Sequence, residues 1–251
     1  MLARRDNTNV RAIMPKLMIH SGLRRDKDVQ TGEPRTRGEL TRQAILARAV
    51  KIAAREGLAA LTIGRLAGEL RMSKSGLFAH FHSKEALELA TLELAREVFA
   101  NAVLRPAQAS RGGVEHLWNL CDLWLQHIER RVFSGAYFFT GAFFEFADRP
   151  GPIAEAITSV AREWFNSLRK AVQEAQAQGE INQDSKANMV AWELNDRLVG
   201  AYWAFLLERR GHFREARIAL LDWLRELATE EIPATAFESV RAWKEYLQRK
   251  S

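Results

Sequence analysis

The sequence lacks the features that mark secreted, membrane-spanning and β-sheet proteins. Its one cysteine, Cys121, excludes an intramolecular disulfide and fits a reducing cytoplasm. No apolar run approaches the ~18–20 residues needed to cross a bilayer, and Pro15 and Lys16 break the N-terminal apolar stretch, which makes it a poor signal peptide. Long alternating runs of β-branched residues, typical of sheets, are also missing. We therefore expect a cytoplasmic, all-helical protein without a membrane segment.

The sequence also has no pattern typical of a catalytic or metal site. Its six histidines are scattered, and no nucleophile, base or carboxylate pair falls at a credible spacing. We expect neither an enzyme nor a bound metal or cofactor. Tight stoichiometric binding of a metal through His116 or His127 would revive the enzymatic interpretation.

Residues 61–87, LTIGRLAGELRMSKSGLFAHFHSKEAL, contain three closely spaced helix starts. Thr62, Ser73 and Ser83 each precede a helical pattern, and a hydroxyl at this position accepts a hydrogen bond from a free backbone N–H. Spacing of i, i+3, i+4 and i+7 places four apolar residues of the first helix on one face. These residues are Ile63, Leu66, Ala67 and Leu70.

The second of these helices, residues 74–81, has an unusual outward face. Leu77 and Phe81 fall on its buried side. A face with a cation, a hydroxyl, a glycine, a large aromatic ring and an imidazole suits a phosphate-lined groove better than water alone. The outward residues are Lys74, Ser75, Gly76, Phe78 and His80.

This stretch resembles the DNA-reading end of TetR-type (TetR/AcrR family) regulators, I/L-A-x-x-x-G-V-S-x-G-x-L-Y-x-H-F-x-S-K-E-x-L. Phe78 takes the Tyr position, which removes a hydroxyl that commonly meets a phosphate, and Met72 takes the Val position. Arg71 stands where the family prefers Gly, so either it has a left-handed backbone at a cost of ~1 kcal/mol or the turn differs. The matches, in register without a gap, are Leu66-Ala67, Ser73, Gly76, Leu77, His80-Phe81, Ser83-Lys84-Glu85 and Leu87.

The resemblance implies an all-α protein with an N-terminal three-helix helix-turn-helix domain and a C-terminal helical domain for ligand binding and dimerisation. It also implies that the start of the second helix enters a major groove while nearby residues contact phosphates. The DNA-binding residues expected from it are Arg42, Thr62, Ser73, Lys74, Ser75, Gly76, Phe78, His80 and Lys84.

The charge distribution favours the same end of the chain. Residues 1–100 contain 18 Lys+Arg and 11 Asp+Glu, whereas residues 101–251 contain 19 and 20. This is the pattern expected of a polyanion-binding domain joined to a neutral one. We expect four regions: a disordered basic extension (1–34), the helix-turn-helix domain (35–100, with the motif at 62–81), the effector-binding and dimerisation domain (101–229), and a tail or helix (230–251).

The C-terminal region contains all seven tryptophans and the aromatic run FSGAYFFTGAFFEF. In TetR-type proteins the corresponding domain encloses an effector pocket, and apolar cavities with a few polar groups suit small molecules. Aromatic residues at helical spacing can equally well fill a core. The candidate lining residues are Trp118, Cys121, Trp124, Phe138, Phe139, Phe143, Trp164 and Trp192.

Two apolar segments, residues 186–208 and 213–227, resemble the helix pair that joins subunits of the family. An intramolecular core is the alternative. The helix-turn-helix motif also predicts a homodimer. One short recognition helix contacts few bases, whereas two subunits related by a two-fold axis read a palindromic site. The expected function is therefore a homodimeric repressor that a small apolar or aromatic effector releases from double-stranded operator DNA. The alternatives are a redox-sensing regulator that acts through Cys121 and a helical protein with a non-regulatory role.

Overall fold

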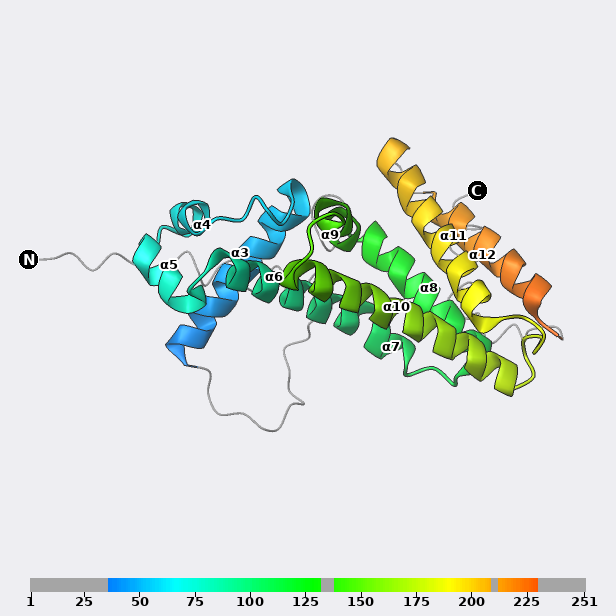
Figure 1. Ribbon diagram of the computed structural model, residues 1–251. Helices are drawn as coiled ribbons and strands as arrows, with labels where there is room; N and C mark the ends of the chain where they lie inside the picture. Colours follow the sequence, from blue (N-terminus) through cyan, green and yellow to red (C-terminus); the bar gives the residue numbers. More distant parts are fainter. Residues whose placement is uncertain (1–35, 132–137, 209–211, 230–251) are drawn as a thin grey trace, which may run out of the picture. The chain divides into compact units, whose positions relative to one another are not determined.

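The computed structural model is helical throughout the part of the chain that it describes, apart from one isolated β-bridge between Ile181 and Ala228. This confirms the all-α prediction. None of the described helices is long and apolar enough to span a membrane. The expected basic extension (1–34) and C-terminal tail (230–251) lie outside the described residues. The described residues are 36–131, 138–208 and 212–229 (Figure 1).

The described residues belong to two compact units. One contains residues up to 102 together with 130–161, and the other contains 103–129 and the residues from 162 onward. The helices are α3 (Arg37–Glu56), α4 (Ile63–Leu70), α5 (Lys74–Phe81), α6 (Lys84–Phe99), the π-helix η1 (Ala100–Leu104), α7 (Arg105–Ala107), α8 (Gly113–Glu129), α9 (Phe138–Phe146), α10 (Pro152–Ala177), α11 (Ala187–Glu208) and α12 (Phe213–Leu227).

Hydroxyl side chains begin the first four of these helices. Thr36 and Glu39 form a reciprocal capping box at the start of α3. At α4, α5 and α6, the side-chain oxygens of Thr62, Ser73 and Ser83 accept from the backbone N–H three residues on, at 3.1, 3.1 and 3.0 Å. The structure therefore confirms the three helix starts that the sequence predicts.

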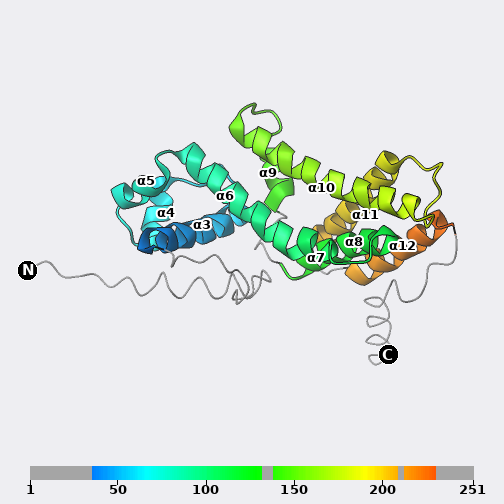
Figure 2. The ribbon, with the colours of Figure 1, turned by 90° about the horizontal axis from the view of Figure 1, so that it is seen from below.

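A small apolar core holds α4 and α5 against α3 and α6 in the first unit (Figure 2). Leu66 and Ala67 of α4 and Leu77 and Phe81 of α5 are at most 2% exposed. Leu70, which shares their predicted face, is half-buried. Because each of these helices has only eight residues, tertiary packing rather than local propensity keeps them helical.

Arg71 ends α4 in the left-handed region, with φ 55° and ψ 38°. Its N–H donates to Gly68 O at 3.2 Å and the N–H of Met72 donates to Ala67 O at 2.9 Å, the two bonds of a Schellman turn. Glycine usually occupies this position because an L side chain there costs about 1 kcal/mol. Of the two alternatives for this position, the structure adopts the strained one.

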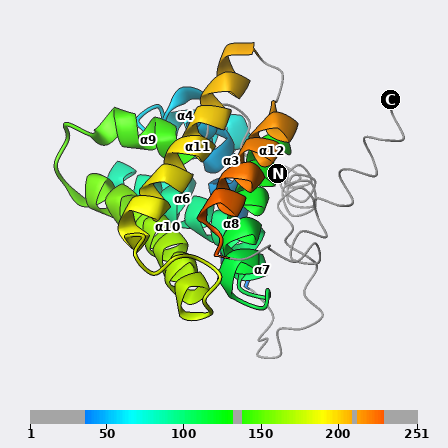
Figure 3. The same ribbon diagram turned by 90° about the vertical axis from the view of Figure 1, so that its right-hand side faces the viewer.

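In the second unit, α8 packs against α11 and α12 (Figure 3), and a buried ion pair ties α12 to α8. Arg217 Nε donates to Asp122 Oδ1 at 2.6 Å, and Arg217 Nη2 lies 3.1 Å from Glu129 Oε2. The side chains of Arg217 and Asp122 are only 5% and 4% exposed. A charge buried to this degree depends on its partner, because water cannot replace it.

Arg217→Ala is therefore expected to lower the free energy of unfolding by about 3–5 kcal/mol, since it leaves the Asp122 carboxylate buried without its cation. Chemical denaturation followed by circular dichroism measures the change. Arg225→Ala, which removes an exposed pair with Asp222, is the control and should cost at most about 1 kcal/mol. Equal losses in the two variants would contradict the assignment.

Candidate nucleic-acid interface

Helix α5 exposes a narrow ridge on the side opposite its buried residues. Ser75 and Ala79 lie one turn apart on this ridge, and Lys74 and Phe78 lie along one flank; all four are exposed. Phe78 is 49% exposed, with its ring edge-on to His82 at a centroid distance of 6.3 Å. The exposed side of a single helix, with no acidic residue, fits the major groove, which admits an α-helix.

Two of the residues predicted to face outward are less exposed than the others. Gly76 and His80 are half-buried on the opposite flank of α5, and Ala79 takes the exposed position that sequence reasoning missed. Its signal was the i+4 spacing from Ser75. Gly76 also has a local role, because a Cβ there would lie 2.9 Å from the capping oxygen of Ser73.

The side chain of Lys74 extends over α4. A Cβ built at Gly64 would lie 3.3 Å from Lys74 Cε and 3.7 Å from its Nζ, so the absence of a side chain at Gly64 leaves room for the lysine. Lys74 therefore lies near the first turn of α4, where backbone N–H groups attract anions. Thr62, which caps that turn, is exposed.

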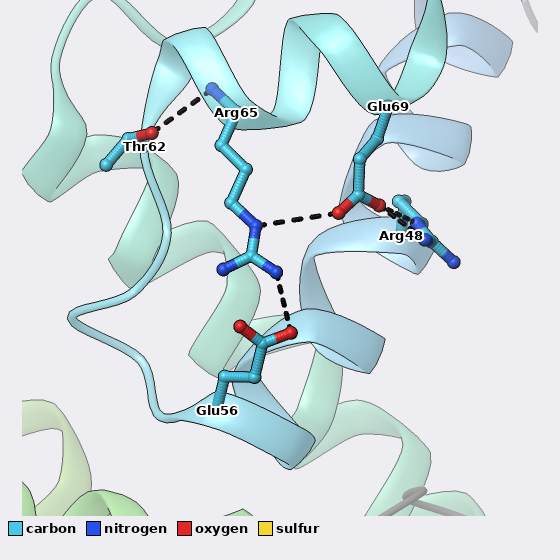
Figure 4. Close-up of polar contacts among 5 residues, drawn as sticks. All are labelled: Arg48, Glu56, Thr62, Arg65 and Glu69. Atoms are coloured by element: carbon cyan, nitrogen blue, oxygen red, sulfur yellow. Dashed lines mark hydrogen bonds and ion pairs between the residues drawn. The ribbon is translucent and has the colours of Figure 1, made fainter.

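Two arginines of this region form ion pairs with carboxylates of the same unit (Figure 4). Arg65 Nη2 donates to Glu56 Oε1 at 2.6 Å, and Arg65 Nε lies 3.5 Å from Glu69. Arg48 binds the other oxygen of Glu69. The hydrogen bond from Arg65 lowers the pKa of Glu56, which keeps the pair ionised. These cations tie α4 to α3 rather than facing outward alone.

Two predicted phosphate contacts also have partners within the first unit. The guanidinium of Arg42 lies over the Phe81 ring, 4.9 Å from its centroid. Lys84 Nζ donates to Ala59 O at 2.8 Å and lies 3.3 Å from Glu88, whose pKa is raised by burial. A phosphate contact from Lys84 would share or replace these bonds. The DNA contacts of both residues remain predictions.

The predicted effector-pocket residues lie on four helices, α8 to α11, and differ in burial. On α8, Trp118, Cys121 and Trp124 are at most 4% exposed and fill the core of the second unit. Trp164 of α10 is also buried, and its Nε1 donates to Asn195 Oδ1 at 3.2 Å. The three phenylalanines and Trp192 differ from these: Phe138 and Phe139 are buried in the first unit, whereas Phe143 and Trp192 are 49% and 56% exposed.

A hollow of about 200 Å³ lies between the end of α3 and helix α9 in the first unit. Phe138, Ala142 and Glu145 border it from α9. The Glu145 carboxylate accepts from the N–H groups of Leu58 at 2.7 Å and Ala59 at 2.8 Å. Sequence reasoning missed this contact, since Glu145 has no motif around it.

The buried thiol of Cys121 is poorly suited to redox sensing. Burial raises its pKa well above the ordinary thiol value, which suppresses the thiolate that reacts with oxidants. The part of the chain that the structure describes also holds no group of three His, Cys, Asp or Glu placed for a metal. His116 Nδ1 instead lies 2.8 Å from Glu174, and burial lowers the pKa of His127 to about 4.

Two family models match the chain. Residues 45–91 match the family described as "Bacterial regulatory proteins, tetR family", and residues 113–220 match "Tetracyclin repressor-like, C-terminal domain". The first match includes the whole of α4 and α5, and the second runs from α8 into α12. No curated protein matches the chain.

Three solved structures of similar fold are distant from this chain in sequence. A TetR transcriptional regulator from Chloroflexus aurantiacus is 23% identical, with a TM-score of 0.70 over 76% of this chain and 97% of its own. A transcriptional regulator from Saccharomonospora viridis, in complex with choline, is 22% identical, with a TM-score of 0.63 over 76% and 98%. AibR, in complex with isovaleryl coenzyme A and operator DNA, is 21% identical, with a TM-score of 0.60 over 74% and 97%.

A negative charge on the ridge of α5 tests whether this surface meets DNA. Ser75→Glu should weaken binding to duplex DNA at least about tenfold, because a carboxylate would face the phosphates. Ser159→Glu, the same change at an exposed site on α10, is the control and should bind as the wild type does. Fluorescence anisotropy with labelled duplex measures both affinities, and equal affinities would exclude this ridge.

Proposed function

Because the chain belongs to the TetR family of transcriptional regulators, we propose that it is a homodimeric repressor, released from a palindromic operator by a small apolar or aromatic effector. Family membership makes it a DNA-binding regulator and not an enzyme. The observation that most directly supports the proposed mode of binding is the exposed ridge of α5, presented beside a turn that Arg71 closes in the left-handed conformation.

Lys74 and Ser75 are the groove-entering residues in this proposal, and Gly76 keeps the cap of α5 intact beneath them. The phosphate contacts come from residues around the ridge and fix its register on DNA. Phe78 lacks a hydroxyl and contributes an apolar contact instead. The remaining positions assigned to the backbone of the duplex are Arg42, Thr62, Ser73, His80 and Lys84.

An uncovered apolar face on α11 supports dimerisation. Four large side chains on this helix are at least half exposed, with values from 50% to 79%. Their spacing of 3, 11 and 4 residues places them on one side of the helix, together with Gly200. Large exposed apolar side chains gathered on one side of a helix favour an interaction site, and the exposed Asp196 lies among them, between Trp192 and Gly200. The four side chains are Met189, Trp192, Trp203 and Leu207.

The adjoining α12 extends this face and supplies a recess for a partner. A hollow of about 340 Å³ between α11 and α12 is lined partly by the small residues Ala201, Ala216 and Ala219. Ile218 of α12 is 44% exposed. Small side chains let a second helix approach closely, so a second copy of this chain is the occupant we propose. The predicted segments 186–208 and 213–227 coincide with these two helices apart from the first residue.

Gly200→Glu is the direct test of this interface. A Cβ at Gly200 meets no atom of the same chain within 4 Å, so the protomer should fold with unchanged or slightly higher stability. The dimer should dissociate, because the carboxylate would be buried against the partner. Sedimentation velocity measures the mass, and operator affinity should fall at least about tenfold with loss of the second half-site.

Gln173→Glu, an exposed position on α10, adds the same charge away from this face and should leave both measurements unchanged. A dimeric Gly200→Glu variant with normal operator affinity would contradict the proposed seam.

The effector part of the proposal draws on the aromatic second unit and on the relatives. AibR was solved with isovaleryl coenzyme A and the Saccharomonospora viridis regulator with choline, and we extend small-molecule binding, without its identity, to this chain. Trp118 and Trp124 remain the candidate contacts in the second unit, with Cys121 between them on α8. Trp192 is better explained by the subunit interface, since it is exposed on α11.

The contact made by Glu145 provides a route from effector to DNA. Glu145 lies in the segment matched by the C-terminal family, whereas Leu58 and Ala59 lie in the segment matched by the DNA-binding family. Its carboxylate holds the two N–H groups that precede α4. An effector that displaced α9 would release this turn and change how α4 and α5 are held. Differential affinity of the effector for the two arrangements then weakens DNA binding by linkage.

Glu145→Gln should loosen the turn without unfolding the protein. The variant loses a charge-assisted acceptor, so the free energy of unfolding should fall by about 1–2 kcal/mol. Hydrogen exchange at the Leu58 and Ala59 amides should accelerate, while exchange within α3 changes less. Asp148→Asn, an exposed neighbour, is the control. Unchanged exchange at Leu58 and Ala59 would show that Glu145 does not hold this turn.

A further inference from the structure

We propose that Arg71 is an additional DNA-contacting residue, whose guanidinium binds a backbone phosphate beside the recognition helix. The inference rests on the proposed binding of DNA through α4 and α5. It goes beyond that proposal because the position is ordinarily a turn glycine and no sequence pattern assigns it a contact.

The first observation is the backbone conformation of Arg71. It occupies the left-handed region at φ 55° and closes the Schellman turn that joins α4 to α5. Glycine would adopt this conformation without strain. A strained residue that persists inside the motif that performs the function points to a use for its side chain.

The second observation is that the positive charge of Arg71 has no partner among the described residues. Arg71 is exposed, and its guanidinium has no hydrogen bond or ion pair with any residue in the described ranges 36–131, 138–208 and 212–229. Arg48 and Arg65, by contrast, are neutralised by Glu56 and Glu69 (Figure 4). Arg42 lies over an aromatic ring. The cation on the turn is therefore available to an external anion.

The third observation is its place in the chain. Arg71 lies two residues before Ser73, the N-cap of α5, and three before Lys74, which opens the exposed ridge. In a helix-turn-helix the second helix enters the major groove while the first crosses the backbone. A long cation on the connecting turn consequently reaches the phosphates that border the groove, not the base edges within it.

Comparing the wild-type arginine with three substitutions distinguishes the effect of the side chain's charge from the effect of the backbone strain. Arg71→Gly removes both, Arg71→Gln removes the charge and keeps the strain, and Arg71→Lys keeps both. The affinity for duplex DNA should follow the charge, so the Gly and Gln variants lose at least about fivefold while Lys loses less. Thermal stability should follow the strain, so only the Gly variant gains a few degrees in Tm.

Salt dependence and sequence independence identify the contact as a phosphate. For the Gly and Gln variants, the slope of log K for DNA binding against log salt concentration should be smaller in magnitude than for the wild type. The difference should be ~0.9 per subunit, or about 2 for a dimer. The duplex is one enriched from a random pool by the wild-type protein, and a scrambled duplex of the same length should lose affinity by the same factor, because phosphates carry no sequence information.

Arg131→Gly is the matched control, because Arg131 is also an exposed arginine with a positive φ, of 49°, but follows α8. Its removal should leave DNA affinity and salt slope unchanged. Wild-type affinity and slope in the Arg71→Gly and Arg71→Gln variants would overturn the inference, and so would a loss confined to the enriched duplex. Failure of the wild-type protein to bind any duplex would instead refute the proposed function itself.

Discussion

The packing of α4 on α5 is the contact on which DNA recognition by this protein depends. Neither eight-residue helix is long enough to persist alone, and both owe their shape to a few fully buried side chains. Leu66 and Ala67 of α4 and Leu77 and Phe81 of α5 are the buried side chains, with almost no surface exposed. A larger side chain at Ala67 would separate the helices and turn the ridge of α5 away from its target. The cap hydroxyls and the Schellman turn then fix where each helix begins and ends.

A second constraint lies at Gly57, where the end of α3 contacts α9. Gly57 has φ 91°, and a Cβ there would lie 3.0 Å from Glu145 Oε2. A side chain at Gly57 would be strained, and its Cβ would crowd the carboxylate that holds the two N–H groups. The turn before α4 is therefore shaped as an anion site that the chain fills with its own Glu145. The proposed release of DNA by an effector would act by breaking this contact.

Local features of the fold could be predicted from the sequence, and partners distant along the chain could not. Cap residues such as Thr62 and the apolar spacing of α4 act over three to seven positions, so the pattern reveals them directly. Glu145 meets Leu58 across 87 positions and Arg217 meets Asp122 across 95, and no periodicity encodes either pairing. The sequence pattern predicts that Lys74 and Ser75 face outward, and both are exposed, but the flanks of α5 depend on how the helix is rotated against its neighbours. That rotation also explains why Ala79 was missed.

A hydroxyl-radical footprint of the protein, on a duplex enriched from a random pool, tests most directly whether a dimer presents two recognition helices to DNA. Such a dimer should protect two half-sites related by a two-fold axis, with centres about 34–36 Å apart or at a multiple of that distance. Each half-site should show protected sugars on the two backbone segments that flank one major groove. A single asymmetric protected segment, or uniform protection along the duplex, would contradict a dimer that presents two copies of α5 to DNA.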